Sequence, residues 1–253
     1  MESRPTHRYW VLGALMLSMI VVGLDSTVLN VALPTLATQL HATTSQLQWI
    51  VDAYLLVLGG LMLPLGALAD RVGRKPVLVA GVVVFTLGSL TAAYVTSPGW
   101  LIATRAVMGM GAAVVLTVPL AVLPTIFTPA ERPRAIATMM VAMGLGLPLG
   151  PIVGGWLLQN YWWGSVFLIN VPIVIIGLVG IALIVPESTG QHTQRLDPLG
   201  VVLSVAGLMT LVYGIVHGGD TRDWGSVTVW GWILLGIGLL ALFVWLELRS
   251  DHP

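Results

Sequence analysis

Eight long apolar runs are the feature that most constrains how this chain can fold. Each is roughly 20 residues long, which is enough to cross the hydrocarbon core of a bilayer as an α-helix. A membrane β-barrel would instead show segments of about ten residues with alternating polarity, and the runs do not alternate. The sequence therefore predicts an all-α, polytopic membrane helix bundle with spans at 9–33, 47–68, 77–95, 100–126, 136–158, 166–185, 199–216 and 229–248.

Composition supports a lipid environment and excludes several classes of function. Hydrophobic residues make up 57% of the chain and charged residues only 9%, against about 25% charged residues in an ordinary soluble domain. The formal net charge of zero offers no basic surface for nucleic acid, and the absence of cysteine removes disulfides and thiolate metal sites. The sequence shows no catalytic triad, no phosphate-binding glycine loop and no metal-ligand cluster. We therefore expect neither an enzyme nor a metalloprotein.

The distribution of basic residues between the loops predicts the orientation in the membrane. Lys and Arg are enriched on the cytoplasmic side of membrane proteins. With eight spans, only Arg222 falls on one side, and the residues on the other are Arg4, Arg8, Arg71, Arg74, Lys75, Arg132, Arg134, Arg195 and Arg249. This asymmetry predicts a multi-pass protein of the cytoplasmic (inner) membrane with both termini of the chain inside the cell.

A polar stretch at 186–198 divides the eight spans into six and two. It reads PESTGQHTQRLDP and is the one plausible linker in the sequence. We expect a six-helix bundle at 1–186, a cytoplasmic linker at 187–198, and two further membrane helices at 199–253 that include the start of the next cytoplasmic segment.

Three acidic or basic side chains lie well inside the predicted spans, away from their ends: Asp25, Asp52 and Arg105. A charge near the bilayer centre costs at least about 2.5 kcal/mol, so each needs a compensating reason. They could form a buried structural ion pair or extend toward the membrane interface, or they could line a water-filled cavity in which a carboxylate accepts and releases a proton. Thr27 and Asn30 follow Asp25 on the same predicted helix, and either helix-to-helix hydrogen bonding or substrate contact would explain them.

A short charged segment separates the second and third spans. An acid, three bases and flexible glycines lie between two apolar runs, which predicts a charged latch in a tight turn where two helices meet at the cytoplasmic face. Its residues are Gly66, Asp70, Arg71, Gly73, Arg74 and Lys75.

The fifth span carries small residues at a regular interval. Glycine at every fourth position lets two helix backbones approach closely, and proline removes a backbone donor and kinks a helix. The pattern predicts a tight, bent contact that serves either as a packing groove or as a hinge between moving halves. The residues are Gly146, Pro148, Gly150, Pro151, Gly154 and Gly155.

These segments resemble those of the major facilitator superfamily, and within it the fourteen-span drug:proton antiporters. The segment 66–78 is similar to the superfamily's loop between helices two and three, and 24–34 to the first-helix motif of the fourteen-span branch. The segment 146–155 resembles the antiporter motif of helix five, and 167–172 the entry to helix six. The segment 105–111 resembles the helix-four motif, except that Met108 stands where glutamine is usual.

The resemblance implies a proton-driven exporter of lipophilic or cationic small molecules, with the proton gradient as its energy source and no cofactor. Asp25 and Asp52 would then be the proton-coupling or cation-attracting acids, and Arg105 the proton-relay arginine of helix four. The charged segment would control the conformational switch. Two alternatives stay open: a dedicated exporter of a lipid, antibiotic or metabolite on the same fold, and a non-transporting membrane partner.

A complete member of that branch has a second six-helix bundle, and substrates bind between the bundles. The sequence supplies one bundle and the two extra helices, so we expect a piece of a longer transporter that works with a C-terminal half. A half-transporter completed by a second copy of the chain is the alternative, and ethidium extrusion by the isolated chain would favour it.

Overall fold

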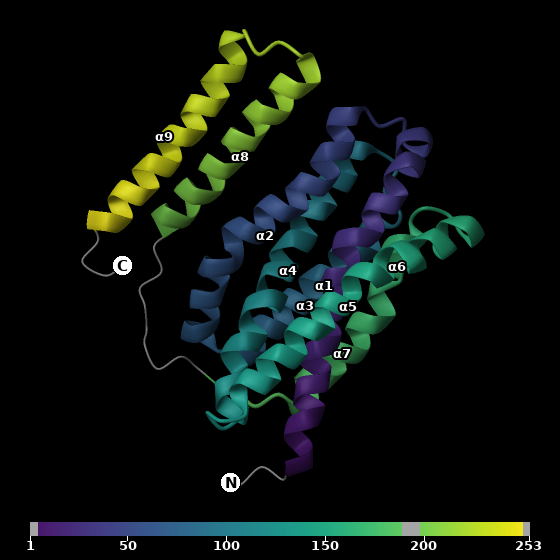
Figure 1. Ribbon diagram of the computed structural model, residues 1–253, viewed down its shortest axis with the longest axis vertical. Coiled ribbons are helices and arrows are strands. Elements are labelled where there is room, and N and C mark those ends of the chain that lie inside the picture. Colours follow the sequence, from purple (N-terminus) through teal and green to yellow (C-terminus); the bar gives the residue numbers. More distant parts are fainter. Residues whose placement is uncertain (1–4, 189–197, 250–253) are drawn as a thin grey trace.

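The computed structural model describes residues 5–188 and 198–249, and these residues are almost entirely helical (Figure 1). Within them there is no β-strand. The helices are α1 (Pro5–Gln39), α2 (Thr44–Val72), α3 (Arg74–Ala92), α4 (Pro98–Ile126), α5 (Arg132–Asn160), α6 (Ser165–Leu168), α7 (Asn170–Ile184), α8 (Pro198–Thr221) and α9 (Val227–Arg249).

The predicted all-α membrane bundle is confirmed. The described part of the chain contains eight helical segments long and apolar enough to cross a membrane, at the positions that the apolar runs predict. The sixth of them joins α6 and α7, which are separated only by Ile169. The predicted linker at 187–198 lies mostly outside the described residues, as do Arg4 and Arg195.

Two helix boundaries differ from the prediction. α1 continues through Pro34 to Gln39, because a proline removes only one backbone donor while Ala32 and Leu36 on either side stay fully buried. α2 extends to Val72, so that a single residue, Gly73, separates it from α3. The predicted charged turn is therefore wrong in its backbone geometry: most of it is helical.

The first seven helices pack into one bundle around a continuous apolar core. α1 packs against α5 and α7, and α4 packs against both α2 and α3. Large side chains that are fully buried fill the centre: Leu15, Tyr54, Phe85, Leu101 and Phe167. α1 and α4 bury the larger part of their most apolar stretch inside the protein. In the other membrane-spanning segments the larger part of this stretch is not buried, as expected for a protein whose outer surface faces lipid.

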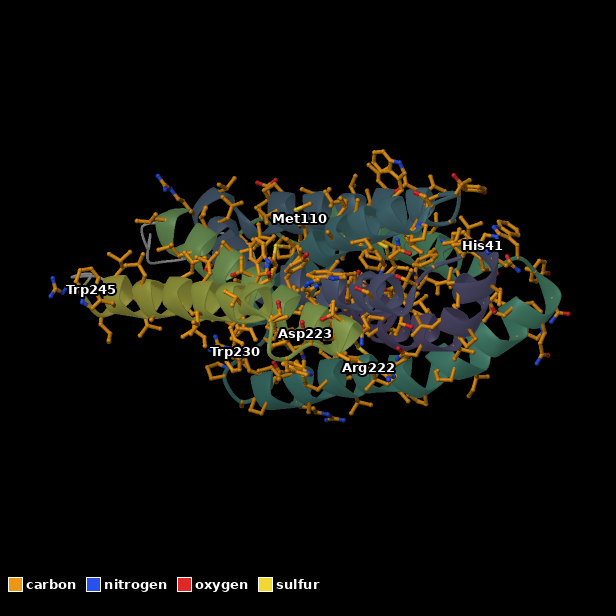
Figure 2. The ribbon with its side chains drawn as sticks, turned by 90° about the horizontal axis from the view of Figure 1, so that it is seen from above. His41, Met110, Arg222, Asp223, Trp230 and Trp245 are labelled. Atoms are coloured by element: carbon orange, nitrogen blue, oxygen red, sulfur yellow. The ribbon has the colours of Figure 1, made fainter. Side chains whose placement is uncertain are left out.

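α8 and α9 form a hairpin that lies beside α2 (Figure 1). α8 contacts α2 through Trp49 and Tyr213, whose ring centroids are 6.0 Å apart, and through Val205, which lies over Gly60. α9 packs on α8 and exposes a largely apolar outer face, with Trp230 and Trp245 towards its two ends (Figure 2). Amphipathic indoles favour the membrane interface, so this face is suited to lipid.

The start of α1 is tied to the turn between α4 and α5. Arg8 forms an ion pair with Glu131 at 2.9 Å. The hydroxyl and the backbone N–H of Thr128 both donate to Glu131, and these bonds, with Arg8, hold the pKa of the Glu131 carboxyl below its ordinary value. Glu131 therefore stays ionised at neutral pH and keeps the ion pair intact.

Candidate functional site

Two of the three intramembrane charges meet in the centre of the bundle. Asp25 of α1 and Arg105 of α4 form an ion pair in which the Asp25 Oδ2 to Arg105 Nη1 distance is 2.6 Å. The Asp25 side chain is 0% exposed and that of Arg105 is 1% exposed. The structure thus shows a buried ion pair, the first of the two arrangements considered for these residues.

α2 supplies the remaining contacts of the Arg105 guanidinium. Its Nε donates to the backbone carbonyl of Ile50 at 3.1 Å, and its central carbon lies 4.1 Å from the centroid of the Tyr54 ring. Gly109 permits this close approach, since a Cβ there would lie only 2.6 Å from the Tyr54 carbonyl oxygen. A planar cation can stack on an aromatic ring and form hydrogen bonds at its edge, which lowers the cost of burying it.

The other oxygen of Asp25 is held from the opposite side of the bundle. Nδ2 of Asn170, the first residue of α7, donates to Asp25 Oδ1 at 2.9 Å and lies 3.2 Å from the Ser89 hydroxyl of α3. Ser89 in turn donates to the carbonyl of Phe167 at 2.8 Å. Six helices, α1, α2, α3, α4, α6 and α7, therefore contribute to one buried polar network.

Most of the uncharged members of this network are not predictable from the sequence. Ser89 and Tyr54 belong to none of the predicted site residues, and Asn170 lies only within a segment that resembles a family motif. The available signal was weak: a serine inside an otherwise apolar run, and an asparagine beside a proline at the start of another.

The third charge, Asp52, lies outside this network. It is two residues from Ile50 and from Tyr54, which both face the core, so its side chain points to the other side of α2. Asp52 is half-buried, and within the described residues it makes no hydrogen bond or ion pair. Unlike Asp25, it has no countercharge within the part of the chain that the structure describes.

The candidates for substrate contact on α1 have different surroundings. Thr27 donates from its hydroxyl to the backbone carbonyl of Leu147 in α5 at 2.9 Å, so it links two helices. Asn30 is exposed. Of the two, Asn30 is the side chain available to a ligand.

The regularly spaced glycines of α5 face α1. A Cβ on Gly146 would lie 2.5 Å from the Ile20 carbonyl oxygen, one on Gly150 would collide with the Thr27 hydroxyl, and one on Gly154 would lie 2.7 Å from Val28. The other residues of the segment lie off this contact: a Cβ on Gly155 would have no neighbouring atom within 4 Å, and Pro148 and Pro151 are exposed. α5 runs unbroken through both prolines.

The charged segment forms a bridge across the junction of α2 and α3. Asp70 Oδ1 accepts from Nε of Arg74 and lies 2.8 Å from its Nη2. Gly73 between the helices has φ +125°, a left-handed value that favours glycine. Arg71 is exposed. Gly66 lies one helical turn before Asp70, close to Thr117 of α4.

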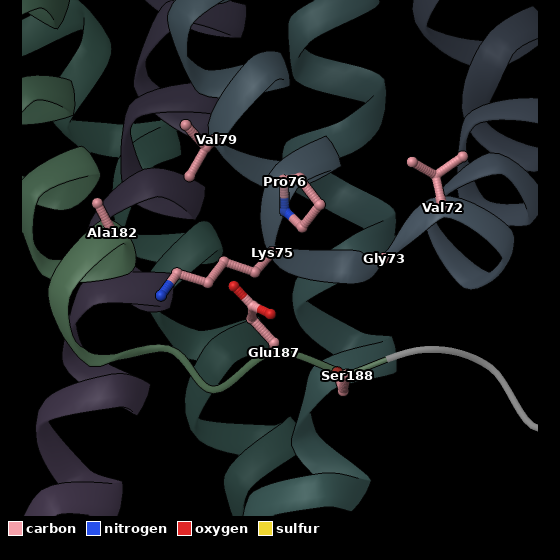
Figure 3. Close-up of a pocket in the computed structure, with 8 residues that line it drawn as sticks. All are labelled: Val72, Gly73, Lys75, Pro76, Val79, Ala182, Glu187 and Ser188. Atoms are coloured by element: carbon pink, nitrogen blue, oxygen red, sulfur yellow. The ribbon is translucent and has the colours of Figure 1, made fainter.

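A cavity of about 300 Å³ lies next to this junction (Figure 3). Lys75 enters it from α3, and Glu187 enters it from the segment that follows α7. The backbone N–H of Arg74 donates to the carbonyl of Ser188 at 2.9 Å. The junction is therefore held to the beginning of the chain segment that leads to α8.

The family model of the Major Facilitator Superfamily matches residues 15–252, nearly the whole chain. The chain belongs to the Major Facilitator Superfamily. A solved transporter structure shows the same fold: the POT family transporter PepTSo superposes with a TM-score of 0.69 at 14% identity, over 99% of this chain and 55% of PepTSo.

Curated superfamily relatives are similar over almost all of this chain. The methyl viologen resistance protein SmvA of Salmonella typhimurium is 38% identical over 97% of this chain and 50% of its own length. The multidrug efflux pump LfrA of Mycolicibacterium smegmatis is 36% identical over 98% and 49%. A probable actinorhodin transporter of Streptomyces coelicolor is 35% identical over 98% and 43%. The chain thus spans about half the length of these relatives.

Proposed function

We propose that this chain is the N-terminal part of a proton-coupled multidrug exporter of the cytoplasmic membrane, which exchanges protons for lipophilic or cationic drugs. Membership of the superfamily indicates a transporter rather than an enzyme. The names of SmvA and LfrA support drug export, and methyl viologen is a dication. The relatives' length supports a C-terminal half as the partner that completes the transport path, with a second copy of the chain as the alternative.

The observation that carries the proposal is the difference between the surroundings of the two intramembrane acids, Asp25 and Asp52. Asp25 is paired with Arg105 and fully buried, whereas Asp52 is half-buried and has no countercharge among the described residues. A carboxylate held in an apolar span costs free energy, so a site that retains one is a candidate for binding a cation or a proton.

Competition between a cation and a proton for carboxylates is sufficient to couple two flows. A cationic drug favours the ionised state of an acid such as Asp52, and a proton displaces the drug from it. Protonation of Asp25 would remove the charge that holds Arg105, which would loosen the contact between α1 and α4. In this proposal Asp52 binds the drug or the proton, and the protonation of Asp25 determines the conformational state.

Export by the full-length protein that contains this chain tests the proposal. In everted membrane vesicles, an imposed pH gradient should drive methyl viologen or ethidium uptake, and a protonophore should abolish it. Asp52→Asn should reduce uptake of the dication by about ten-fold, the loss expected for one interaction of about 1.4 kcal/mol. The matched control is Asp223→Asn in the exposed turn between α8 and α9, which should transport normally.

Unchanged dication uptake by Asp52→Asn would remove Asp52 from the mechanism. Uptake that ignores the protonophore would contradict proton coupling. Absence of flux for every substrate tested, with stable association with another membrane protein, would favour a non-transporting partner.

A dedicated exporter is the second candidate function, because the probable actinorhodin transporter is nearly as similar to this chain as LfrA. A panel of unrelated cations and neutral aromatic compounds separates the two. Transport of a single compound class would favour the dedicated exporter, and transport of several would favour the multidrug pump.

The bridge between Asp70 and Arg74 gives a separate prediction about the conformational switch. The pair is partly exposed and four residues apart on the chain, so Asp70→Asn should lower the free energy of unfolding by only about 0.5 kcal/mol. If the bridge acts as a latch, vesicle transport should nevertheless fall several-fold at unchanged protein abundance. Equal and small effects on stability and transport would show a purely structural pair. Asp223→Asn, which removes the same negative charge at an exposed position outside the segment, is the matched control.

A further inference from the structure

The side-chain amide of Asn170 is buried but only half satisfied. Asn170 is 0% exposed, and its Nδ2 lies within hydrogen-bond distance of Asp25 and Ser89. Its Oδ1 is also buried and has no hydrogen-bond partner among the described residues. An unsatisfied buried acceptor costs free energy, so its presence beside a carboxylate needs an explanation.

The neighbours of the amide determine which of its two ends faces Asp25. Ser89 donates its hydroxyl proton to the Phe167 carbonyl, so its oxygen can offer only lone pairs to Asn170. An ionised Asp25 likewise offers only lone pairs. The NH₂ group is the end that satisfies both neighbours, and Oδ1 is left over as long as Asp25 carries a negative charge.

We propose that Asn170 is a positioning residue that follows the protonation state of Asp25. With Asp25 ionised, the Asn170 NH₂ group holds Oδ1 of the carboxylate while Arg105 holds Oδ2. When a proton from water binds Asp25 Oδ1, the new O–H needs an acceptor. A half turn of the amide about its terminal torsion presents Asn170 Oδ1 to that proton, and the hydrogen bond between the two residues reverses direction.

The position of Asn170 in the fold gives this reversal a mechanical consequence. Asn170 begins α7 directly after the break at Ile169, and the Ser89 to Phe167 bond holds α3 to the other side of that break. After the rotation Asn170 Oδ1 also faces the Ser89 oxygen, so that contact stays a hydrogen bond only if the Ser89 hydroxyl turns its proton from the Phe167 carbonyl to Asn170. The charge on Asp25 is thereby linked to the way α7 joins α1 and α3.

The inference rests on the proposed proton coupling, and its chemistry is confined to a small group of side chains. Charged or titratable neighbours of Asp25 are Arg105 from α4 and Tyr54 from α2, while α3 and α7 contribute the uncharged Ser89 and Asn170. No group other than Asp25 needs to change its protonation state in this step.

Infrared difference spectroscopy of the purified full-length protein can test Asn170 independently of transport. The carbonyl band of protonated Asp25 is identified by its loss in Asp25→Asn. Asn170→Leu should shift that band to higher frequency, because the acid loses its acceptor. It should also move the pH at which the band is half developed upwards by about one unit, because the ionised form loses a hydrogen bond to a charged group, which is stronger than the neutral bond that the protonated form loses.

Two further variants keep the test decisive. Asn170→Gln retains both ends of the amide and should restore the low-frequency band at least in part. Asn160→Leu, at an exposed asparagine that bonds only within α5, should leave band and midpoint unchanged. If Asn170→Leu does not fold, Asn170→Ala should show the same two shifts.

An Asp25 band that keeps its frequency and midpoint in Asn170→Leu or Asn170→Ala would overturn the inference. Vesicle flux decides the proposed function separately: flux without proton dependence, together with the expected infrared shifts, would refute the pump and leave the response of Asn170 to Asp25 established.

Discussion

Replacing Arg105 with methionine should lower the free energy of unfolding by about 3–5 kcal/mol, because it leaves Asp25 as an unpaired charge in a fully buried site. The variant also loses the hydrogen bond to Ile50 and the stacking on Tyr54. Methionine fills much of the arginine volume, so the effect reports the charge more than a cavity. Unfolding of the purified protein in mixed micelles, followed by tryptophan fluorescence, would measure it.

A second substitution separates the charge from the packing. Asp25→Asn in the Arg105→Met background removes the buried negative charge and should recover a large part of the lost stability, without restoring transport. Arg134→Met, at an exposed arginine near the start of α5, should change stability by less than about 0.5 kcal/mol. A double variant no more stable than Arg105→Met would show that the ion pair contributes through packing alone.

The sequence was sufficient to predict the membrane spans, and it identified Asp25, Asp52 and Arg105 as costly. It could not predict which of them meet. Asp25 and Arg105 are 80 residues apart, and their contact depends on how α1 and α4 are rotated about their axes. That rotation is set by close approaches such as the one at Gly109, which become visible only when the helices are packed. Asp52 looked equivalent in sequence and lies outside the pair.

The helix ends were harder to predict. The length of an apolar run indicates where the chain leaves the hydrocarbon core of the membrane, but the helix can continue beyond that point. α2 begins after Thr43, whose side chain and that of Gln46 form a capping box, and it ends at Gly73. The capping box and Gly73 both lie in polar segments outside the apolar run. Asp70 and Arg71 consequently belong to the last turn of a helix, and the ion pair of Asp70 with Arg74 joins two helices rather than lying within a loop.

Uncharged polar residues were the weakest signal of all. Serine and asparagine cost little enough in a span that a single one does not demand a partner, so Ser89 and Asn170 gave no reason to expect a network. Their roles appear only because the break at Ile169 brings the start of α7 to the carboxylate of Asp25. The charged members of the site were predictable from energetics, and the uncharged members were not.

Gly146→Leu should separate α1 from α5 and destabilise the bundle by about 3 kcal/mol, the upper range for overpacking a tight contact. The Cβ alone would lie 2.5 Å from the Ile20 carbonyl oxygen and 2.8 Å from the Leu24 amide nitrogen. Both are backbone atoms of a long helix, so no side-chain rotation can relieve the collision. Because Leu24 precedes Asp25, a displaced α1 should also weaken the ion pair with Arg105, and pH-driven uptake in vesicles should be lost.

Gly155→Leu provides a control on the same helix with the same added side chain. No atom outside the neighbouring backbone of its own helix lies within 4 Å of the position of its Cβ, so stability should change by less than about 0.5 kcal/mol and transport should persist. If both variants fail equally, α5 requires glycine for bending rather than for contact with α1, and the hinge interpretation of this segment is favoured. If only Gly146→Leu fails, the spacing of glycines matters because it allows α1 to hold Asp25 in place. The regular pattern on α5 and the buried charge on α1 are then parts of a single arrangement.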